Sequence, residues 1–233
     1  MPLQAESDAD LRGRAAIVTG AGGGTGRHVA LALAAAGVAV ALNDLNPDRA
    51  AGVCAEIVAG GGAALACPGD VANRFQVANL IERARDRFGR VSLLVNAAGA
   101  GPLQRPLLRL DEWDWRRLLD VNLTGAFFCM QLMGRVMAEE GGGVMLNLVR
   151  DMERCQPGAN AGTAAAHAGL VGLTRQAARE LAPQGIRVNA LCVADEAPAA
   201  VAAAALLLCA DAGAELQGTC LSVSEVTGRL TPR

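Results

Sequence analysis

Residues 19–26 read Thr-Gly-Ala-Gly-Gly-Gly-Thr-Gly, and this stretch decides the fold. The loop follows a short apolar run, Ala15–Thr19, and precedes an Ala- and Leu-rich segment of helical period. In such a loop Gly20 permits a tight turn, Gly24 lets the backbone approach a pyrophosphate, and Gly26 lets helix and strand pack closely. The helix N-terminus would present free N–H groups to the phosphates. The stretch therefore predicts a dinucleotide-binding α/β unit.

Apolar runs and helical segments alternate along the rest of the chain. Strands are expected at Ala15–Thr19, Val38–Asn43, Ala63–Cys67, Leu93–Val95, Val144–Leu148, Ile186–Leu191 and Thr219–Val223. Helices are expected at Gly24–Ala36, Pro47–Ala59, Arg74–Phe88, Asp111–Glu139, Ala161–Leu181 and Pro198–Ala210. This order predicts an α/β fold, a single Rossmann-like, doubly wound parallel sheet of about seven strands flanked by helices. We expect the domain to span residues 12–224, with tails at 1–11 and 225–233.

The composition favours a folded cytoplasmic domain. Of the 233 residues 52% are apolar and the net charge is −2, which gives no basic surface for nucleic acid or anionic lipid. The longest apolar stretch, Val29–Leu42, is shorter than the roughly 18–20 residues of a membrane span. The acidic residues within 1–10 are unlike a signal peptide. The seven cysteines form no C-x-x-C pair, only two histidines are present, and no carboxylate or thiol spacing suggests a metal site, so we expect no metal.

Asp44 ends the second predicted strand, about 20 residues after the glycine loop. At this place a carboxylate accepts a hydrogen bond from a ribose 2′-OH and repels a 2′-phosphate. Asp44 therefore favours NAD over NADP. The alternative is that Asp44 only caps the helix that begins near Pro47.

Further motifs follow in order. They are Gly69-Asp70-Val71, Asn96-Ala97-Ala98-Gly99, Asn122 within Asp-Val-Asn-Leu-Thr-Gly, Gly169–Leu173 and Ile186–Ala190. With the spacing Thr-Gly-x-x-x-Gly-x-Gly, they resemble the short-chain dehydrogenase/reductase family over about Arg12 to Val223. The resemblance implies that an NAD site is formed by Gly20, Gly24, Gly26, Asp44, Asp70, Val71, Asn96 and Gly99. It also implies that Asn122 kinks its helix.

The same resemblance implies a catalytic half that this chain lacks. Family members place a serine at the end of the fifth strand and, on the next helix, a tyrosine and a lysine that share one face. The tyrosine exchanges a proton with the substrate oxygen, the lysine lowers the tyrosine's pKa and binds the nicotinamide ribose, and the serine orients the oxygen. The chain contains no tyrosine at all. Val149 and Arg150 stand at the serine positions, Thr163 replaces the tyrosine, and His167 replaces the lysine.

These replacements do not restore the reaction. Arg150 keeps its charge and cannot act as a general acid or base. The hydroxyl of Thr163 is too weakly acidic, and His167, which could titrate near neutrality, is interpreted as a partly buried polar residue. Val193-Ala194 stand where the family has Pro-Gly, and Asp195–Ala197 lead straight into a helix, without the family's mobile substrate lid.

The leading hypothesis is a non-catalytic subunit that pairs with an active paralogue of the family in a hetero-oligomer, expected to be a heterotetramer. Its NAD binding would be weak or vestigial, because only the adenosine half of the site is kept. Such pairings are known in the family among enzymes that oxidise hydroxyacyl-CoA intermediates, including the 2-(hydroxyphenylmethyl)succinyl-CoA dehydrogenase of anaerobic toluene breakdown. The alternatives are an NAD(H)-sensing regulator and an oxidoreductase with a site rewired around Arg150, Thr163 and His167.

The predicted interface lies on the two long helices, Asp111–Glu139 and Ala161–Leu181, and on the last helix. The long helices carry leucines at roughly helical intervals, namely Leu118, Leu119, Leu170, Leu173 and Leu181. Trp113 and Trp115 are two residues apart, so at most one of them would anchor a partner. The alternative is that these apolar stripes only cover the chain's own sheet.

Overall fold

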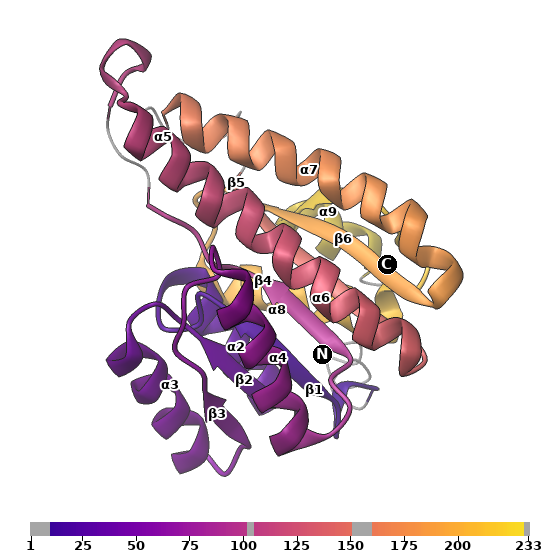
Figure 1. Cartoon of the computed structure of the whole chain (residues 1–233). Helices are drawn as coiled ribbons and strands as arrows, with labels where there is room; N and C mark the ends of the chain where they lie inside the picture. Colours follow the sequence, from indigo (N-terminus) through magenta and orange to yellow (C-terminus); the bar gives the residue numbers. More distant parts are fainter. Residues whose placement is uncertain (1–9, 102–104, 151–159, 231–233) are drawn as a thin grey trace.

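The computed structural model describes residues 10–101, 105–150 and 160–230. Its centre is one parallel sheet of seven strands in the order β3-β2-β1-β4-β5-β6-β7 (Figure 1). The strands are β1 (Ala15–Thr19), β2 (Ala39–Asn43), β3 (Ala64–Ala66), β4 (Leu93–Asn96), β5 (Gly143–Arg150), β6 (Ile186–Val193) and β7 (Cys220–Ser222). The winding direction reverses between β1 and β4, where open α/β sheets bind their ligands. The predicted fold class is confirmed.

Helices cover both faces of the sheet. One face packs against α2 (Gly24–Ala35), α3 (Pro47–Ala59), α8 (Pro198–Cys209) and α9 (Val223–Leu230). The other packs against α4 (Arg74–Phe88), α6 (Gly125–Glu139) and α7 (Ala161–Leu181), and α5 (Glu112–Leu119) leads into α6. Figure 1 shows α6 and α7 lying side by side. Because parallel strands are buried on both sides, they read as continuous apolar runs.

The long helix predicted over Asp111–Glu139 is interrupted. Asp111 caps α5 by accepting from the Asp114 N–H at 2.8 Å. A π-helical turn, Asp120–Thr124, then separates α5 from α6. Asn122 lies in this turn, where a single-turn π-bulge commonly marks a functional site. Asn122 therefore lies where the predicted long helix changes its hydrogen-bond pattern.

Both predicted tails extend too far into the chain. Leu11, assigned to the N-terminal tail, is fully buried in the core. Residues 225–230 belong to α9, and Val226 is fully buried. Ser222 and Glu225 form a reciprocal cap, in which the Glu225 carboxylate accepts from the Ser222 N–H and the Ser222 hydroxyl accepts from the Glu225 N–H. This Ser-x-x-Glu pattern is a sequence signal for a helix start that the prediction missed.

Part of the predicted interface covers the chain's own core. Leu118 and Leu170 are 1% and 2% exposed, so neither faces a partner. The alanines of α8 are also largely buried, and α8 packs against α2 and α9 of the same chain. For these residues the alternative interpretation holds.

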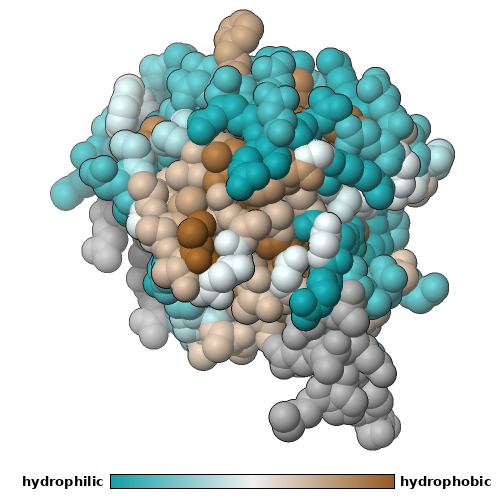
Figure 2. All heavy atoms as spheres, turned by 90° about the horizontal axis from the view of Figure 1, so that it is seen from below, coloured by the Kyte–Doolittle hydropathy of each residue, from teal (hydrophilic) through white to brown (hydrophobic). Residues whose placement is uncertain are grey.

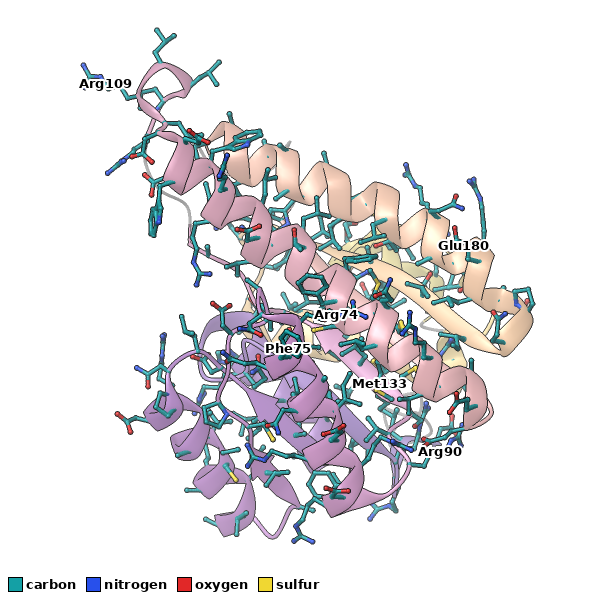
Figure 3. All side chains as sticks on the ribbon, viewed as in Figure 1. Arg74, Phe75, Arg90, Arg109, Met133 and Glu180 are labelled. Atoms are coloured by element: carbon teal, nitrogen blue, oxygen red, sulfur yellow. The ribbon has the colours of Figure 1, made fainter. Side chains whose placement is uncertain are left out.

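The surface is unevenly apolar. Seen from below, apolar residues gather in the middle of the face, and hydrophilic residues lie mainly above and to the right of them (Figure 2). At the other end, a 3₁₀ turn, Leu107–Arg109, projects beyond α5 with Arg109 at its outer end (Figure 3). Leu108 in this turn is 97% exposed and Trp113 on α5 is 72% exposed. No helix among the described residues is long and apolar enough to cross a membrane.

Candidate functional site

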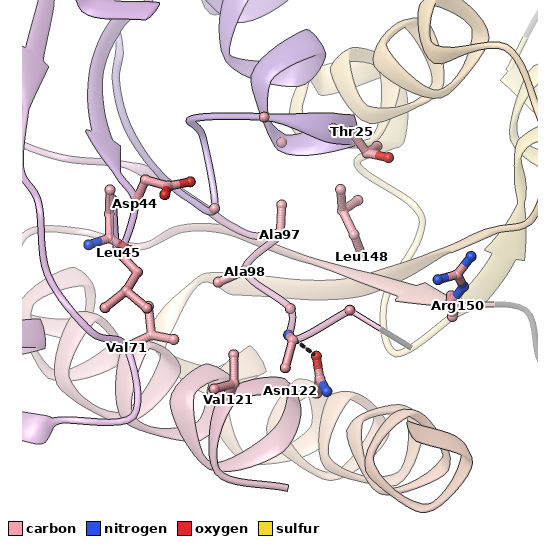
Figure 4. Close-up of a pocket in the computed structure, with 18 of the residues that line it drawn as sticks. Thr25, Asp44, Leu45, Val71, Ala97, Ala98, Val121, Asn122, Leu148 and Arg150 are labelled. Carbon is pink, nitrogen blue, oxygen red and sulfur yellow. Dashed lines mark hydrogen bonds between the residues drawn. The ribbon is translucent and has the colours of Figure 1, made fainter. Parts of the chain in front are cut away.

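A cavity of about 540 Å³ lies at the carboxyl edge of the sheet. It is lined by most of the residues singled out from the sequence, namely Gly20, Gly24, Gly26, Asp44, Asp70, Val71, Gly99, Asn122, Arg150, Thr163 and His167. Figure 4 shows Asp44 at one end of the cavity and Arg150 at the other, with Ala97 and Ala98 between them. The fold thus brings the two groups of predicted residues into one site. Asn96 is the predicted site residue that does not line it.

The glycine loop is packed too closely for side chains. Gly20 has φ +63°, and a Cβ atom there would lie 2.7 Å from Ala98 Cα. A Cβ atom at Gly26 would collide with the backbone carbonyl of Gly20. The Thr19 hydroxyl accepts from the Ala97 and Ala98 N–H groups, both at 3.1 Å, and so joins β1 to the segment after β4. These contacts hold the loop at the switch point of the sheet.

The N-terminus of α2 is open. Its N-cap, Gly23, offers no side-chain hydrogen bond to the first turn. Added Cβ atoms at Gly23 and Gly24 would meet nothing within 4 Å, and Gly24 has φ +51°. The first N–H groups of a helix have no partners within the helix, and they attract phosphate. The loop and this helix end therefore fit the pyrophosphate of a dinucleotide.

Asp44 is positioned by the glycine loop. Its Oδ2 accepts from the Gly22 N–H at 3.1 Å and its Oδ1 from the Asn46 N–H at 2.9 Å. The cap of α3 is Asn46, whose side chain accepts from the N–H groups of Asp48 and Arg49. The alternative in which Asp44 caps this helix is wrong. Asp44 lines the cavity, as a ribose ligand must.

Asp70 lies at the adenine end of the predicted site. One carboxylate oxygen accepts from the Ala72 N–H at 2.9 Å, and the other pairs with Arg117 at 3.2 Å. Val71 packs against Gly125, where an added Cβ atom would lie 2.8 Å from Val71 Cγ2. The carboxylates at this end of the cavity are thus engaged within the protein.

Asn96 and Asn122 have different structural roles. The Asn96 amide donates to Asn147 Oδ1 at 2.8 Å beneath the cavity, and Asn147 in turn donates to the Thr174 hydroxyl at 2.9 Å. This buried chain ties β4 and β5 to α7, and sequence analysis did not single out Thr174. Asn122 Oδ1 accepts from the Ala100 N–H at 3.0 Å (Figure 4). Its Nδ2 is buried and has no hydrogen-bond partner among residues 10–101, 105–150 and 160–230.

The catalytic end brings together the three replaced positions. Arg150 ends β5, and Thr163 and His167 lie four residues apart on one face of α7. The Arg150 N–H donates to His167 Nδ1 at 3.4 Å. Thr163 is 1% exposed, and its hydroxyl has no hydrogen-bond partner among the described residues.

His167 is neutral at physiological pH. Burial, aided by the positive charge of Arg150, lowers the pKa of His167 from 6.5 to about 4. The sequence-based expectation that His167 could titrate near neutrality is therefore wrong. A neutral imidazole cannot supply the positive charge that lysine gives to the family's tyrosine.

The connection after β6 is short. Val193 ends β6 and α8 begins at Pro198, so the link comprises residues 194–197. The Ala194 N–H donates to the Glu196 carboxylate at 2.6 Å. Val193 and Ala194 both line the cavity. The described segment contains no lid.

In the described part of the chain, no group of three or more His, Cys, Asp or Glu side chains could hold a metal ion.

Fold and site together define an α/β protein of the Rossmann-like class, with a glycine loop that suits a dinucleotide pyrophosphate. The profile of the family described as Enoyl-(Acyl carrier protein) reductase matches residues 20–195. A 3-oxoacyl-[acyl-carrier-protein] reductase of Synechocystis sp. is 40% identical over 78% of this chain and 73% of the relative. This chain belongs to the short-chain dehydrogenase/reductase family of oxidoreductases.

Two further similarities bear on function. The (2S)-[(R)-hydroxy(phenyl)methyl]succinyl-CoA dehydrogenase subunit BbsD of Thauera aromatica is 36% identical over 79% of this chain and 73% of that protein. The structure of a 7α-hydroxysteroid dehydrogenase complexed with NADH and 7-oxo glycochenodeoxycholic acid superimposes with a TM-score of 0.86. It is 30% identical and covers 94% of this chain and 96% of that chain.

Proposed function

We propose that this chain is a non-catalytic subunit of a hetero-oligomeric, NAD-dependent short-chain dehydrogenase whose active paralogue carries the reaction. The observation that carries the proposal is the chemistry of the catalytic end. The chain has no tyrosine, and the pKa of His167 is about 4. A general acid works best when its pKa lies near the operating pH. The rewired-enzyme alternative needs such an acid, and His167 holds almost no proton at neutral pH.

The adenosine half of an NAD site fits this cavity better than the nicotinamide half. The glycine loop, the open end of α2 and Asp44 suit the pyrophosphate and ribose. At the other end Arg150 places a fixed positive charge where the oxidised nicotinamide ring, itself positive, would lie. NAD(H) accepts or donates a hydride when bound to family members. In this chain we propose that its binding is weak or vestigial.

Two apolar surfaces of the molecule support the proposal of a partner subunit. One is the apolar tip formed by Leu107, Leu108 and Trp113, which are 69%, 97% and 72% exposed. The other is a groove of about 520 Å³ between α6 and α7, here called the α6–α7 groove, lined chiefly by Phe127, Met130, Gly134, Leu173, Ala177 and Leu181. Exposed apolar patches of this kind mark interaction sites. We propose that an active paralogue covers both in a heterotetramer.

The relatives suggest the substrate class. One is named for an acyl group on acyl carrier protein, and another is named as a subunit of a dehydrogenase for a hydroxyacyl-CoA of aromatic type. We therefore propose a hydroxyacyl-CoA of aromatic, toluene-type catabolism as the substrate of the complex.

Co-expression tests this proposal. The tagged chain is expressed alone and together with a paralogue of the same genome that retains Tyr-x-x-x-Lys. The expected result is a stoichiometric complex whose NAD-dependent turnover disappears when the paralogue's tyrosine is replaced by phenylalanine. Turnover by the purified single chain would overturn the proposal. A stable single chain that binds NAD tightly and associates with no paralogue would favour the regulator instead.

A further inference from the structure

At the catalytic end of the cavity, the Arg150 guanidinium has no carboxylate partner among the described residues. A guanidinium can only donate hydrogen bonds. The acids that line the cavity, Asp44 and Asp70, lie at its other end and are already bonded. Glu196, near the rim, accepts from the Ala194 N–H. The positive charge of Arg150 is therefore not neutralised by the described part of the chain.

Three neutral groups that line the same cavity are also hydrogen-bond donors. Because Asn122 Oδ1 accepts from the Ala100 N–H, the buried atom that has no partner among the described residues is the donor Nδ2. Because His167 Nδ1 accepts from the Arg150 N–H, the neutral ring carries its proton on Nε2. The Thr163 hydroxyl is buried and has no partner in the part of the chain that the structure describes. A buried polar group without a partner is destabilising, so a ligand oxygen that accepts from it would stabilise the protein.

We propose that this end of the cavity binds the carboxylate of a small organic acid, held by Arg150 with Thr163, Asn122 and His167 as neutral donors. A single guanidinium matches the charge of one carboxylate and its forked geometry. The surrounding wall is apolar, formed by Leu148, Val149, Val193 and Ala194. The ligand therefore carries an apolar body next to its carboxylate. The site requires no turnover and no partner, so it stands apart from the proposed function.

Binding of a carboxylate can be measured by NMR through the two histidines of the chain. Uniform ¹⁵N-histidine labelling of the full chain gives signals from His28 and His167 alone. Sodium benzoate is the probe, benzamide its neutral counterpart and inorganic phosphate the competing anion. Benzoate should shift the His167 signals saturably and raise the pKa of His167 above about 4, because a nearby anion stabilises the imidazolium. His28 should not respond.

Variants assign the effect to Arg150. Arg150→Gln should weaken benzoate binding about tenfold or more, the range expected for a charge-assisted hydrogen bond. The matched control is Arg117→Gln, which removes a cavity arginine whose charge already faces Asp70, and it should leave benzoate binding unchanged. Benzamide binding as tightly as benzoate, phosphate binding more tightly, or an Arg150→Gln variant with full affinity would each overturn the proposal. Absence of a saturable benzoate shift in the folded chain would also overturn it.

Discussion

Arg150 changes the electrostatics of the whole catalytic end. It places a guanidinium at the end of β5, with its backbone N–H bonded to His167. Desolvation and this positive charge both act on the imidazole in the same direction, toward the neutral form. A neutral donor beside a fixed cation suits the binding of an anion and does not suit proton transfer.

The protonation of His167 should make stability depend on pH. Its pKa is about 4 when folded, against 6.5 when free. As pH falls below 6.5, the unfolded chain gains a proton at this residue that the folded chain does not, so stability is complete above 6.5 and declines toward pH 4. Relative to His167→Gln, the wild type should lose about 2–3 kcal/mol between pH 7 and 4.5, measured by urea unfolding. A His28→Gln variant should keep the wild-type slope.

Replacing Gly20 by a residue with a side chain should lower the stability of the protein for a steric reason. At φ +63° an alanine is strained, and its Cβ atom would lie 2.7 Å from Ala98 Cα. Gly20→Ala should therefore lower the free energy of unfolding by about 1–3 kcal/mol. Gly23→Ala is the control, since Gly23 has φ −168° and open space around its Cβ position. It should change stability by less than about 0.5 kcal/mol. Equal stability of the two variants in chemical denaturation would contradict this argument.

At the scale of helices and strands, periodicity and glycine punctuation predicted the strands and most helices because the sheet is buried on both faces and its connections are short. Periodicity did not show the π-turn at Asp120–Thr124, because a single five-residue turn is too short to produce a period of its own. It also missed α9, whose signal was the local Ser222–Glu225 cap.

In the candidate site, too, some features could be predicted from the sequence and others could not. The glycine loop and the replaced positions could be placed from motifs. The pKa of His167 and the Asn96–Asn147–Thr174 chain could not, because burial and partners far apart in sequence determine them.

Helical glycines should respond oppositely to alanine according to their surroundings. Gly52 lies on the exposed face of α3, and an added Cβ atom meets nothing within 4 Å. Gly52→Ala should raise stability by about 0.5–1 kcal/mol through helix propensity. Gly125, at the start of α6, has Val71 Cγ2 2.8 Å and the Val71 backbone carbon 3.3 Å from its Cβ position. Gly125→Ala should lower stability despite the same gain in propensity. Thermal unfolding of both variants compares the signs directly, and stabilisation by both would show that Val71 moves aside.

At the scale of the whole molecule, the fold keeps the scaffold of the family and alters one end of its site. The sheet order and the glycine loop suit the family's fold, and the link between β6 and α8 comprises residues 194–197. Helix α8 packs on α2 and α9, so this face of the sheet is covered by the chain itself. The packing helices are compatible with a chain that acts through association.

A substitution in the α6–α7 groove tests association separately from folding, because the groove lies on the surface. Ala177 lines the groove and is partly exposed, so Ala177→Arg adds a charged side chain to an apolar surface without entering the core. If a partner covers this groove, the bulk of the new side chain and the desolvation of its charge should weaken the complex at least about tenfold, as seen by mass photometry of dilute samples. Ala51→Arg, on the exposed side of α3, is the matched control and should assemble normally. Both variants should unfold like the wild type when monomeric. An Ala177→Arg chain that assembles as tightly as the control would place the partner elsewhere, with the tip around Leu108 and Trp113 as the next surface to substitute.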